Sequence, residues 1–299
     1  MKYFAYVLLI ISTLFFIFCS LNSGFNTLNT LTFNPEIASY FGSFVGGILS
    51  PFLTIVSILL LLQNLKDQKK ENKANEIRSH IFELLKYNRE TVNDFEYTIS
   101  YDPTAQTYKG SRFFVTAKRQ IEEAITSISG FKPTYSKNVL MQIGYLIFYF
   151  GVGSESEDTL KEYLMEIVDE SETNDIIAFF KIKKSAYNSR IYYYGGNQNK
   201  LAHYFRQLYF IISLIDENKD YDAEQQIKLS KILRVQLGNY EQAVLFYNSL
   251  TTLGLAWSRK IGDTKCLLEK YELIKNIQNG FLKNVNVKDI YPNIEYEKT

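Results

Sequence analysis

Polar side chains that could carry chemistry gather in the last third of the chain. His203, Arg206 and Tyr209 interrupt one apolar run, and Arg234 and Glu241 interrupt the next two. If these segments are antiparallel helices, an Arg206–Glu241 or Arg234–Glu241 pair would give a buried network, which persists only when every group is satisfied. The full set of candidates is His203, Tyr204, Arg206, Tyr209, Arg234, Gln236, Glu241, Tyr247 and Asn248.

This polar cluster has two interpretations. The first is a set of ion pairs that fixes the register of the helices, because such networks perturb titratable groups in structural as well as functional places. The second is a pocket for a phosphate-bearing or nucleotide-like signal, since an arginine guanidinium group offers a planar, bidentate fork of donors. The sequence leaves both open.

Familiar catalytic and metal-binding motifs are missing from the sequence. It has no GxxxxGK[ST] phosphate loop and no Gly-x-Ser-x-Gly nucleophile motif. With two histidines and two distant cysteines, we expect no metal site, no disulfide and no cofactor. The formal net charge of +1 does not indicate general nucleic-acid binding. Any enzymatic activity would have to rest on a site without a known motif.

Two apolar stretches precede the polar region and predict membrane spans. Residues 41–62 lie within a stretch that has no charged side chain between Glu36 and Lys66, long enough to cross a bilayer as a helix. Residues 3–21 are also uncharged, and we expect a second span there, because a small-residue cleavage site typical of a signal peptide is missing. The lysines that follow the second span mark its cytoplasmic side; they are Lys66, Lys69, Lys70 and Lys73.

Small residues distinguish the first half of the second span. Gly42, Gly46 and Ser50 recur every four residues, with Ser43 and Gly47 beside them. Small side chains allow another helix to approach closely in lipid. The partner could be the chain's own first span or the span of another copy, which would make the protein a homo-oligomer.

The rest of the chain has the periodicity of helices, and the predicted fold class is all-α. Residues 66–100 contain no proline or glycine and repeat apolar residues at three-to-four spacing, which predicts an amphipathic stalk continuous with the span. Further helices are predicted over 112–129, 136–150, 154–170, 174–189, 198–217, 222–237, 240–253 and 263–279, with a turn at 151–153 and an ordered loop or short strand at 190–196. We therefore expect a transmembrane hairpin (1–65), a stalk (66–100) and a cytoplasmic helical domain (101–299).

Several segments resemble the AbiC-like phage abortive infection proteins of bacteria. They are the two apolar N-terminal stretches, FGSFVGGILSPFLTIVSILLLL, HIFELLKYNRE, HYFRQLYFIISLID, RVQLGNYEQAVLFYNSLTTLG and LLEKYELIKNI. The resemblance implies defence against bacteriophage by shutting down or killing the infected cell, and it supplies no biochemical activity.

Two functions follow as hypotheses, both for a multi-pass protein of the bacterial inner membrane with cytoplasmic termini. In the first, the cytoplasmic helices sense an unknown phage or host trigger and the spans perturb the bilayer. In the second, the spans tether a nuclease or nucleotide-processing enzyme whose polar centre contains His203, Arg206, Arg234 and Glu241. A scaffold that anchors a partner is a third, simpler reading. The expected partners are the lipid bilayer, the trigger and further copies of the chain.

Overall fold

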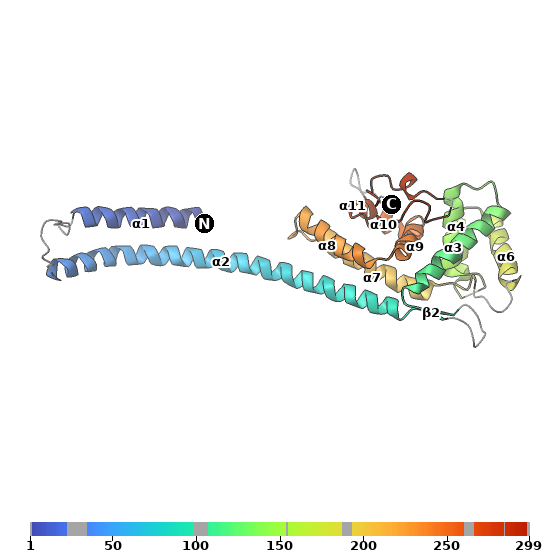
Figure 1. Ribbon diagram of the computed structural model, residues 1–299, viewed down its shortest axis with the longest axis horizontal. Helices are drawn as coiled ribbons and strands as arrows, with labels where there is room; N and C mark the ends of the chain where they lie inside the picture. The colour runs from blue at the N-terminus through green and yellow to red at the C-terminus, as the bar shows by residue number, and fades with distance from the viewer. Residues whose placement is uncertain are drawn as a thin grey trace. The chain divides into compact units, whose positions relative to one another are not determined.

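The computed structural model describes residues 2–22, 35–98, 107–153, 155–186, 193–259, 266–283 and 285–297. The described residues are mostly helical, which confirms the all-α prediction (Figure 1). The chain divides into two compact units, Met1–Arg78 and Ser79–Thr299, which we call the first unit and the globular unit. The boundary between them falls inside the predicted stalk.

The first unit contains two helices, α1 (Lys2–Asn22) and the beginning of α2 (Pro35–Asn93). They lie side by side and antiparallel (Figure 1), and the rings of Phe16 and Phe41 approach to 6.4 Å between centroids. The helix α2 passes through Pro51 and continues without interruption from the apolar stretch into the charged one. The predicted continuity of span and stalk is therefore confirmed.

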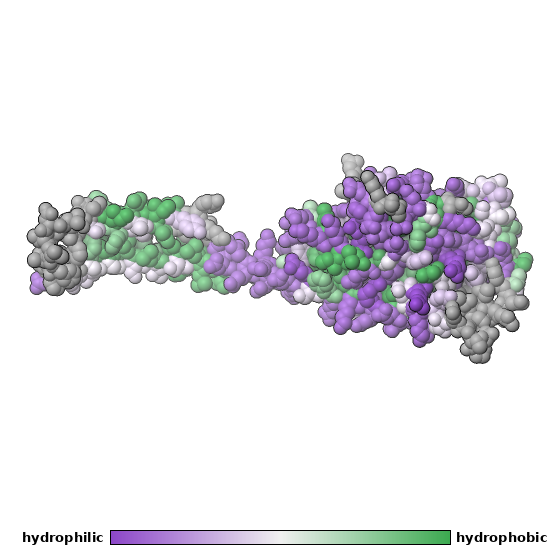
Figure 2. Space-filling model, in the orientation of Figure 1, coloured by the Kyte–Doolittle hydropathy of each residue, from purple (hydrophilic) through white to green (hydrophobic). Residues whose placement is uncertain are grey.

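Of the helices in the described residues, α2 is the one long and apolar enough to cross a membrane by length and composition. Its most apolar stretch has a mean hydropathy of 2.4 and only 11% of it is buried, whereas the core helix of a soluble protein is mostly buried. In α1 the described apolar stretch, Tyr6–Phe18, is shorter than a typical span. On the face drawn in Figure 2, apolar side chains gather over the described part of α1 and the first part of α2, and hydrophilic side chains follow along α2. The second span stays a prediction.

The globular unit takes in the last turns of α2 and is built around α9. Its remaining elements are β1 (Glu96–Thr98), β2 (Thr107–Lys109), α3 (Arg112–Phe131), α4 (Lys137–Phe150), α5 (Glu157–Met165), α6 (Glu170–Ala186), α7 (Gln198–Asp216), α8 (Ala223–Gln236), α9 (Asn239–Ser249), α10 (Leu255–Ser258) and α11 (Leu267–Lys270), with 3-10 turns at Thr252–Gly254 and Val287–Asp289. Every residue of α9 from Glu241 onwards is buried, and α3, α4 and α10 pack against it.

Two glycines allow the backbone at the end of α4 to lie directly against the backbone that leads into α7. Gly151 and Gly196 both have positive φ, at 78° and 86°, and a Cβ added to Gly196 would lie 2.3 Å from the carbonyl oxygen of Phe150. Glycine adopts such φ values without steric cost. The two segments are joined by hydrogen bonds from the Val152 amide to the Tyr194 carbonyl (2.9 Å) and from the Asn197 amide to the Tyr149 carbonyl (2.8 Å). The predicted turn at 151–153 is confirmed, and it fixes the start of α7.

Three predictions before α7 need correction. The stalk helix ends at Asn93 rather than near residue 100, because the chain turns into an antiparallel β1–β2 pair that the sequence did not predict and buries Phe95. Helix α3 continues through Gly130 to Phe131. The helix predicted over 154–170 ends at Met165, and α6 begins earlier than predicted. Ser154, at the start of that predicted helix, and residues 190–192 of the predicted loop lie outside the described residues, and residues 193–196 form a turn.

The helices after Leu237 also differ from the prediction. The sequence favours Asn239 with Gln242 as a capping pair, but the N-terminus of α9 is capped by the Glu241 carboxylate, which accepts from the Gly238 amide (2.6 Å). Gln242 instead points inward, where its side chain donates to the Leu237 carbonyl and accepts from the Asn276 amide. The long helix predicted over 263–279 is helical only over Leu267–Lys270, because Glu272 takes a positive φ of 50°. Its predicted cap, Asp263, lies outside the described residues.

Candidate functional site

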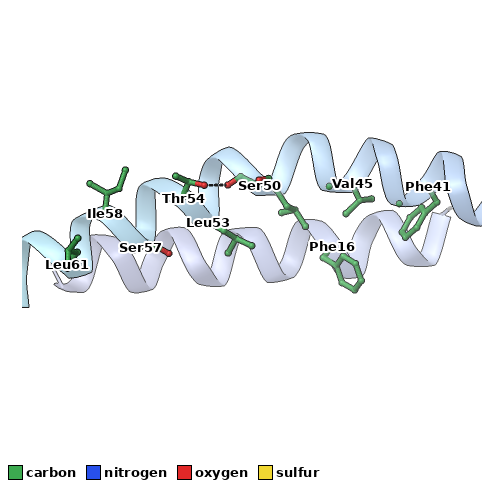
Figure 3. A pocket seen from close by; sticks show the side chains of 12 residues that line it. Phe16, Phe41, Val45, Ser50, Leu53, Thr54, Ser57, Ile58 and Leu61 are labelled. Carbon is green, nitrogen blue, oxygen red and sulfur yellow. Dashed lines mark hydrogen bonds between the residues drawn. The ribbon is translucent and has the colours of Figure 1, made fainter.

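A groove of about 690 Å³ runs along one face of α2 in the first unit (Figure 3). Residues three or four apart in a helix share a face, and the lining follows that spacing. The lining residues are Phe16 of α1 and Phe41, Gly42, Val45, Gly46, Leu49, Ser50, Leu53, Thr54, Ser57, Ile58 and Leu61 of α2. The groove therefore follows the predicted small-residue face and extends it by about three turns.

The structure divides the five small residues predicted to pack. Gly42, Gly46 and Ser50 line the groove, whereas Ser43 and Gly47 do not. Within the described part of the chain, nothing lies within 4 Å of a Cβ built on Gly42, Gly46 or Gly47. Close packing of these glycines against the chain's own first helix is thus not found, and this face of α2 has room for a further helix.

The hydroxyl groups of the groove do not make it a polar channel. The Thr54 hydroxyl donates to the Ser50 carbonyl of its own helix at 2.8 Å (Figure 3). Such an internal bond satisfies a polar group in an apolar environment. The lining is otherwise dominated by glycine and aliphatic or aromatic side chains. The chemistry that this face supports is close packing rather than ion binding.

An ion pair of the globular unit joins the buried Glu241 to a residue that the sequence analysis did not single out. Arg89, in the last turns of α2, places its two terminal nitrogens 2.7 and 3.4 Å from the two carboxylate oxygens of Glu241. Glu241 is 2% exposed and Arg89 is 29% exposed. Because the same carboxylate caps α9 through the Gly238 amide, one side chain ties the end of α2 to the start of α9.

The surroundings of the pair keep the Arg89 guanidinium group charged. Burial would lower the pKa of Arg89, but the hydrogen-bonded Glu241 carboxylate outweighs that effect and raises it above the ordinary value. Tyr204 is fully buried beside the pair, and burial together with the Glu241 charge raises the pKa of its hydroxyl well above the usual range. Arg89 is therefore a cation and Tyr204 a neutral phenol at any physiological pH.

A second set of polar contacts joins the end of α2 to α7. The Gln207 side chain accepts from the Asn88 amide (3.2 Å) and donates to the Thr91 hydroxyl (3.3 Å). It also lies 2.6 Å from the Nε2 atom of His203, whose ring meets the Tyr87 ring edge-on at 6.2 Å. His203 is exposed, and its described contacts belong to this helix–helix interface.

The predicted pairing of Glu241 with Arg206 or Arg234 is wrong. Arg206 lies on the exposed side of α7 and donates to the Ala202 carbonyl of its own helix. Arg234 donates to Glu272 at 3.1 Å, and Glu272 also binds Lys275. Helical periodicity showed which side chains share a face, but the partner of Glu241 comes from α2, far away in the sequence.

The remaining predicted residues take part in separate contacts. Tyr209 meets the Trp257 ring edge-on at 5.4 Å, and the Asn248 side chain donates to the Tyr145 hydroxyl (2.9 Å). Tyr247 is buried, and burial followed by the charge of Glu122 raises its pKa. Gln236 is half-buried at the end of α8. The nine predicted residues are thus distributed over several helix contacts rather than one pocket.

Two cavities of the globular unit lie elsewhere. One, of about 340 Å³, has Lys137 and Lys283 in its lining, and the other, of about 490 Å³, has Lys137, Glu269 and Tyr291. Neither is lined by any of the nine predicted residues. In the described residues the contacts of Glu241 connect helices α2 and α9.

Arg89 could have been suspected from the sequence. It lies in the segment HIFELLKYNRE, directly after Asn88, and the stripe Ile81, Leu85, Asn88 and Val92 is buried along one side of α2. An arginine at the edge of such a stripe reaches inward with its long side chain and needs an acidic partner there. The sequence offers many acidic residues and does not say which one.

Comparison with known proteins supports the resemblance in the part of the chain that contains α7, α8 and α9. Residues 196–282 match the family model described as "Putative phage abortive infection protein". Searches of curated proteins and of solved structures found no match. The matched segment contains Glu241, Gln207 and Arg234, whereas Arg89 and the groove on α2 lie outside it. In residues 196–282 the chain is therefore similar to that family, in agreement with the resemblance seen in the sequence.

Proposed function

We propose that the chain is a membrane-anchored protein of bacterial defence against bacteriophage. In this proposal the globular unit senses infection, and the helices of the first unit associate or rearrange so that the membrane leaks. The family match supports a role in abortive infection. The observation that carries the membrane mechanism is the unfilled small-residue groove on a long, exposed, apolar helix.

The membrane arrangement in this proposal is a two-span hairpin in the inner membrane. α2 supplies one span, and α1 supplies the other because its 21 residues are enough, at about 1.5 Å per residue, to cross the hydrocarbon core. Lys66, Lys69, Lys70 and Lys73 follow the apolar part of α2 and favour a cytoplasmic location for that end. Both termini and the globular unit are then cytoplasmic.

Association through the groove gives the spans an active role. In lipid, helices associate through close packing, and glycine faces allow the closest approach. Gly42 and Gly46 have room on their outer side for the backbone of another helix. A second copy of α2 presents the same face, so two or more copies can fill each other's grooves, whereas a passive anchor needs only apolar length.

The test compares the same substitution on two neighbouring glycines. Gly46→Leu fills the groove, while Gly47→Leu adds equal bulk outside it, and each added side chain has space within the described chain. Both variants should insert in normal amount, because leucine favours the membrane interior. We expect Gly46→Leu to abolish phage protection and early depolarisation of infected cells, and Gly47→Leu to retain both. Full protection and normal depolarisation with Gly46→Leu would exclude the membrane mechanism.

The tethered-enzyme hypothesis finds no support in the contacts of its proposed centre. Glu241 pairs with Arg89, Arg234 pairs with Glu272, and His203 lies on the exposed surface of α7. The two hypotheses are separated by measuring RNA and DNA integrity beside membrane potential after infection. Nucleic-acid breakdown that precedes depolarisation would favour the enzyme.

A further inference from the structure

We propose that the Arg89–Glu241 pair is a latch that holds the end of α2 on residues 196–282, the segment matched by the family model, in the resting protein. The latch opens when the protein is activated. The inference rests on the proposed function, because it names how the globular unit restrains the membrane helix. It assigns a regulatory role to Arg89, which lies outside the family match.

The position of the pair allows it to control α2. The helix is continuous from Pro35 to Asn93, and rigid secondary elements with two arrangements are the usual carriers of coupling between distant sites. Beyond the helix, the Phe95 ring packs against Phe113 (5.0 Å) and Phe114 (5.9 Å). This aromatic cluster fixes the end of α2, and Arg89 lies about one and a half turns before it. Opening the pair would leave the buried side chains of Ile81, Leu85 and Val92, together with the Phe95 cluster, to hold the end of α2.

The pair is stronger than the other polar contacts of this interface. Its 2.7 Å hydrogen bond joins two charged groups, which makes it roughly twice as strong as a neutral one, and the second guanidinium nitrogen lies 3.4 Å from the other carboxylate oxygen. The contacts of Gln207 with Asn88 and Thr91 are neutral and longer than 3.1 Å. Loss of the ion pair therefore removes the dominant polar restraint on this part of α2.

The geometry also permits opening. Arg89 is 29% exposed, so its guanidinium group can move into water without disruption of the core. Glu241 is buried, but it keeps the Gly238 amide as a partner at 2.6 Å when Arg89 leaves. A carboxylate at a helix N-terminus is further stabilised by the helix dipole. The open state is thus accessible, which distinguishes a latch from a permanent structural link.

The closed pair belongs to the resting state. We take the arrangement with Arg89 and Glu241 joined at 2.7 Å as the one before activation. Activation then involves opening of the latch and filling of the groove by other copies. Weakening the latch should favour activation without infection.

The test uses Glu241→Gln in the full chain, which removes the charge and keeps both the size and the acceptor for the Gly238 amide. Glu272→Gln is the matched control, because Arg234 and Glu272 both lie within residues 196–282 and the described partners of Glu272 lie outside α2. In detergent-solubilised protein, amides of residues 79–93 should exchange about tenfold faster in Glu241→Gln, as expected when a charge-assisted bond becomes neutral, and at the original rate in Glu272→Gln. Uninfected cells that express Glu241→Gln should lose viability, and those with Glu272→Gln should not.

Either of two results would overturn the latch. One is unchanged exchange over residues 79–93, and the other is faster exchange in cells that stay viable and protected as before. Arg89→Lys keeps the positive charge but loses the two-pronged guanidinium group, so it must change amide exchange over residues 79–93 and cell viability in the same direction as Glu241→Gln. It replaces Glu241→Gln in the test if that variant does not fold. Combining Glu241→Gln with Gly46→Leu separates the two proposals: if toxicity disappears, both hold, and if it persists, the latch stands and the groove mechanism fails.

Discussion

Replacement of Arg89 by alanine is expected to destabilise the globular unit by about 3 kcal/mol. The substitution leaves the Glu241 carboxylate, which is 2% exposed, with the Gly238 amide and the neighbouring Tyr204 hydroxyl group but without a counter-charge. Removing one member of a buried pair costs about 3 to 5 kcal/mol, because the charge that stays buried loses its counter-charge. Arg89 is 29% exposed, so water can reach part of the vacated space, and the lower end of that range applies.

A double-mutant cycle tests the origin of this loss. Glu241→Gln removes the charge and keeps an acceptor for the Gly238 amide, so it should cost only about 1 to 2 kcal/mol. Arg89→Ala combined with Glu241→Gln should cost at least about 1 kcal/mol less than the sum of the single changes, because no buried charge is then left unpaired. Arg234→Ala is the control and should cost about 1 kcal/mol, since Glu272 keeps Lys275 and the Glu295 amide as partners.

The assay is urea unfolding of the full chain in detergent, followed by tryptophan fluorescence. Trp257 is the only tryptophan of the sequence and is buried in the globular unit, so its emission reports that unit alone. The slope of the free energy with urea should stay constant across the variants. A loss below about 0.5 kcal/mol for Arg89→Ala, or additive single changes, would refute the reasoning, since exposed ion pairs contribute that little.

Two further predictions concern topology and pH. A reporter fused after Thr299 should be active only as a cytoplasmic reporter, and one inserted near Asn29 only as an external reporter, because the lysines follow the second span. A C-terminal reporter that is active outside the cell would contradict this topology. Burial would raise the pKa of Glu272, but Lys275, the Glu295 amide and Arg234 outweigh it and lower the pKa. The stability that the charged Glu272 carboxylate contributes is complete above its ordinary pKa of about 4.3 and is lost as the pH falls through the lower pKa of the folded chain. Below about pH 4, the melting temperature of Glu272→Gln should therefore fall less than that of the unchanged chain.

Local patterns predicted the helices well where a short-range signal decides them. The absence of glycine and proline after Pro51 predicted that span and stalk are one helix, as α2 shows. Ser136 and Asp222 precede α4 and α8 and cap them through bonds to Val139 and Gln225. Such signals act over three or four residues and need no knowledge of the tertiary fold.

The same local reasoning failed where distant contacts compete with helical propensity. The helix predicted over 263–279 stops after Lys270, and farther along the Asn276 amide is bound by the buried Gln242 side chain instead of a helical carbonyl. The stalk ends early because residues 96–98 pair with residues 107–109. A sequence pattern contains the propensity of each segment, but not the partner that overrides it.

For the candidate site, the sequence by itself determined which residues have the chemical character to matter, and the tertiary structure decided how they combine. The four-residue repeat of Gly42, Gly46 and Ser50 placed them on one helical face because the helix period is fixed. That this face is unfilled, and that Gly47 lies outside it, follows only from the placement of α1. Likewise Glu241 was recognised as a buried acid, yet its partner Arg89 lies 152 residues away. Helical periodicity specifies faces, whereas the pairing of two faces depends on the packing of the whole chain.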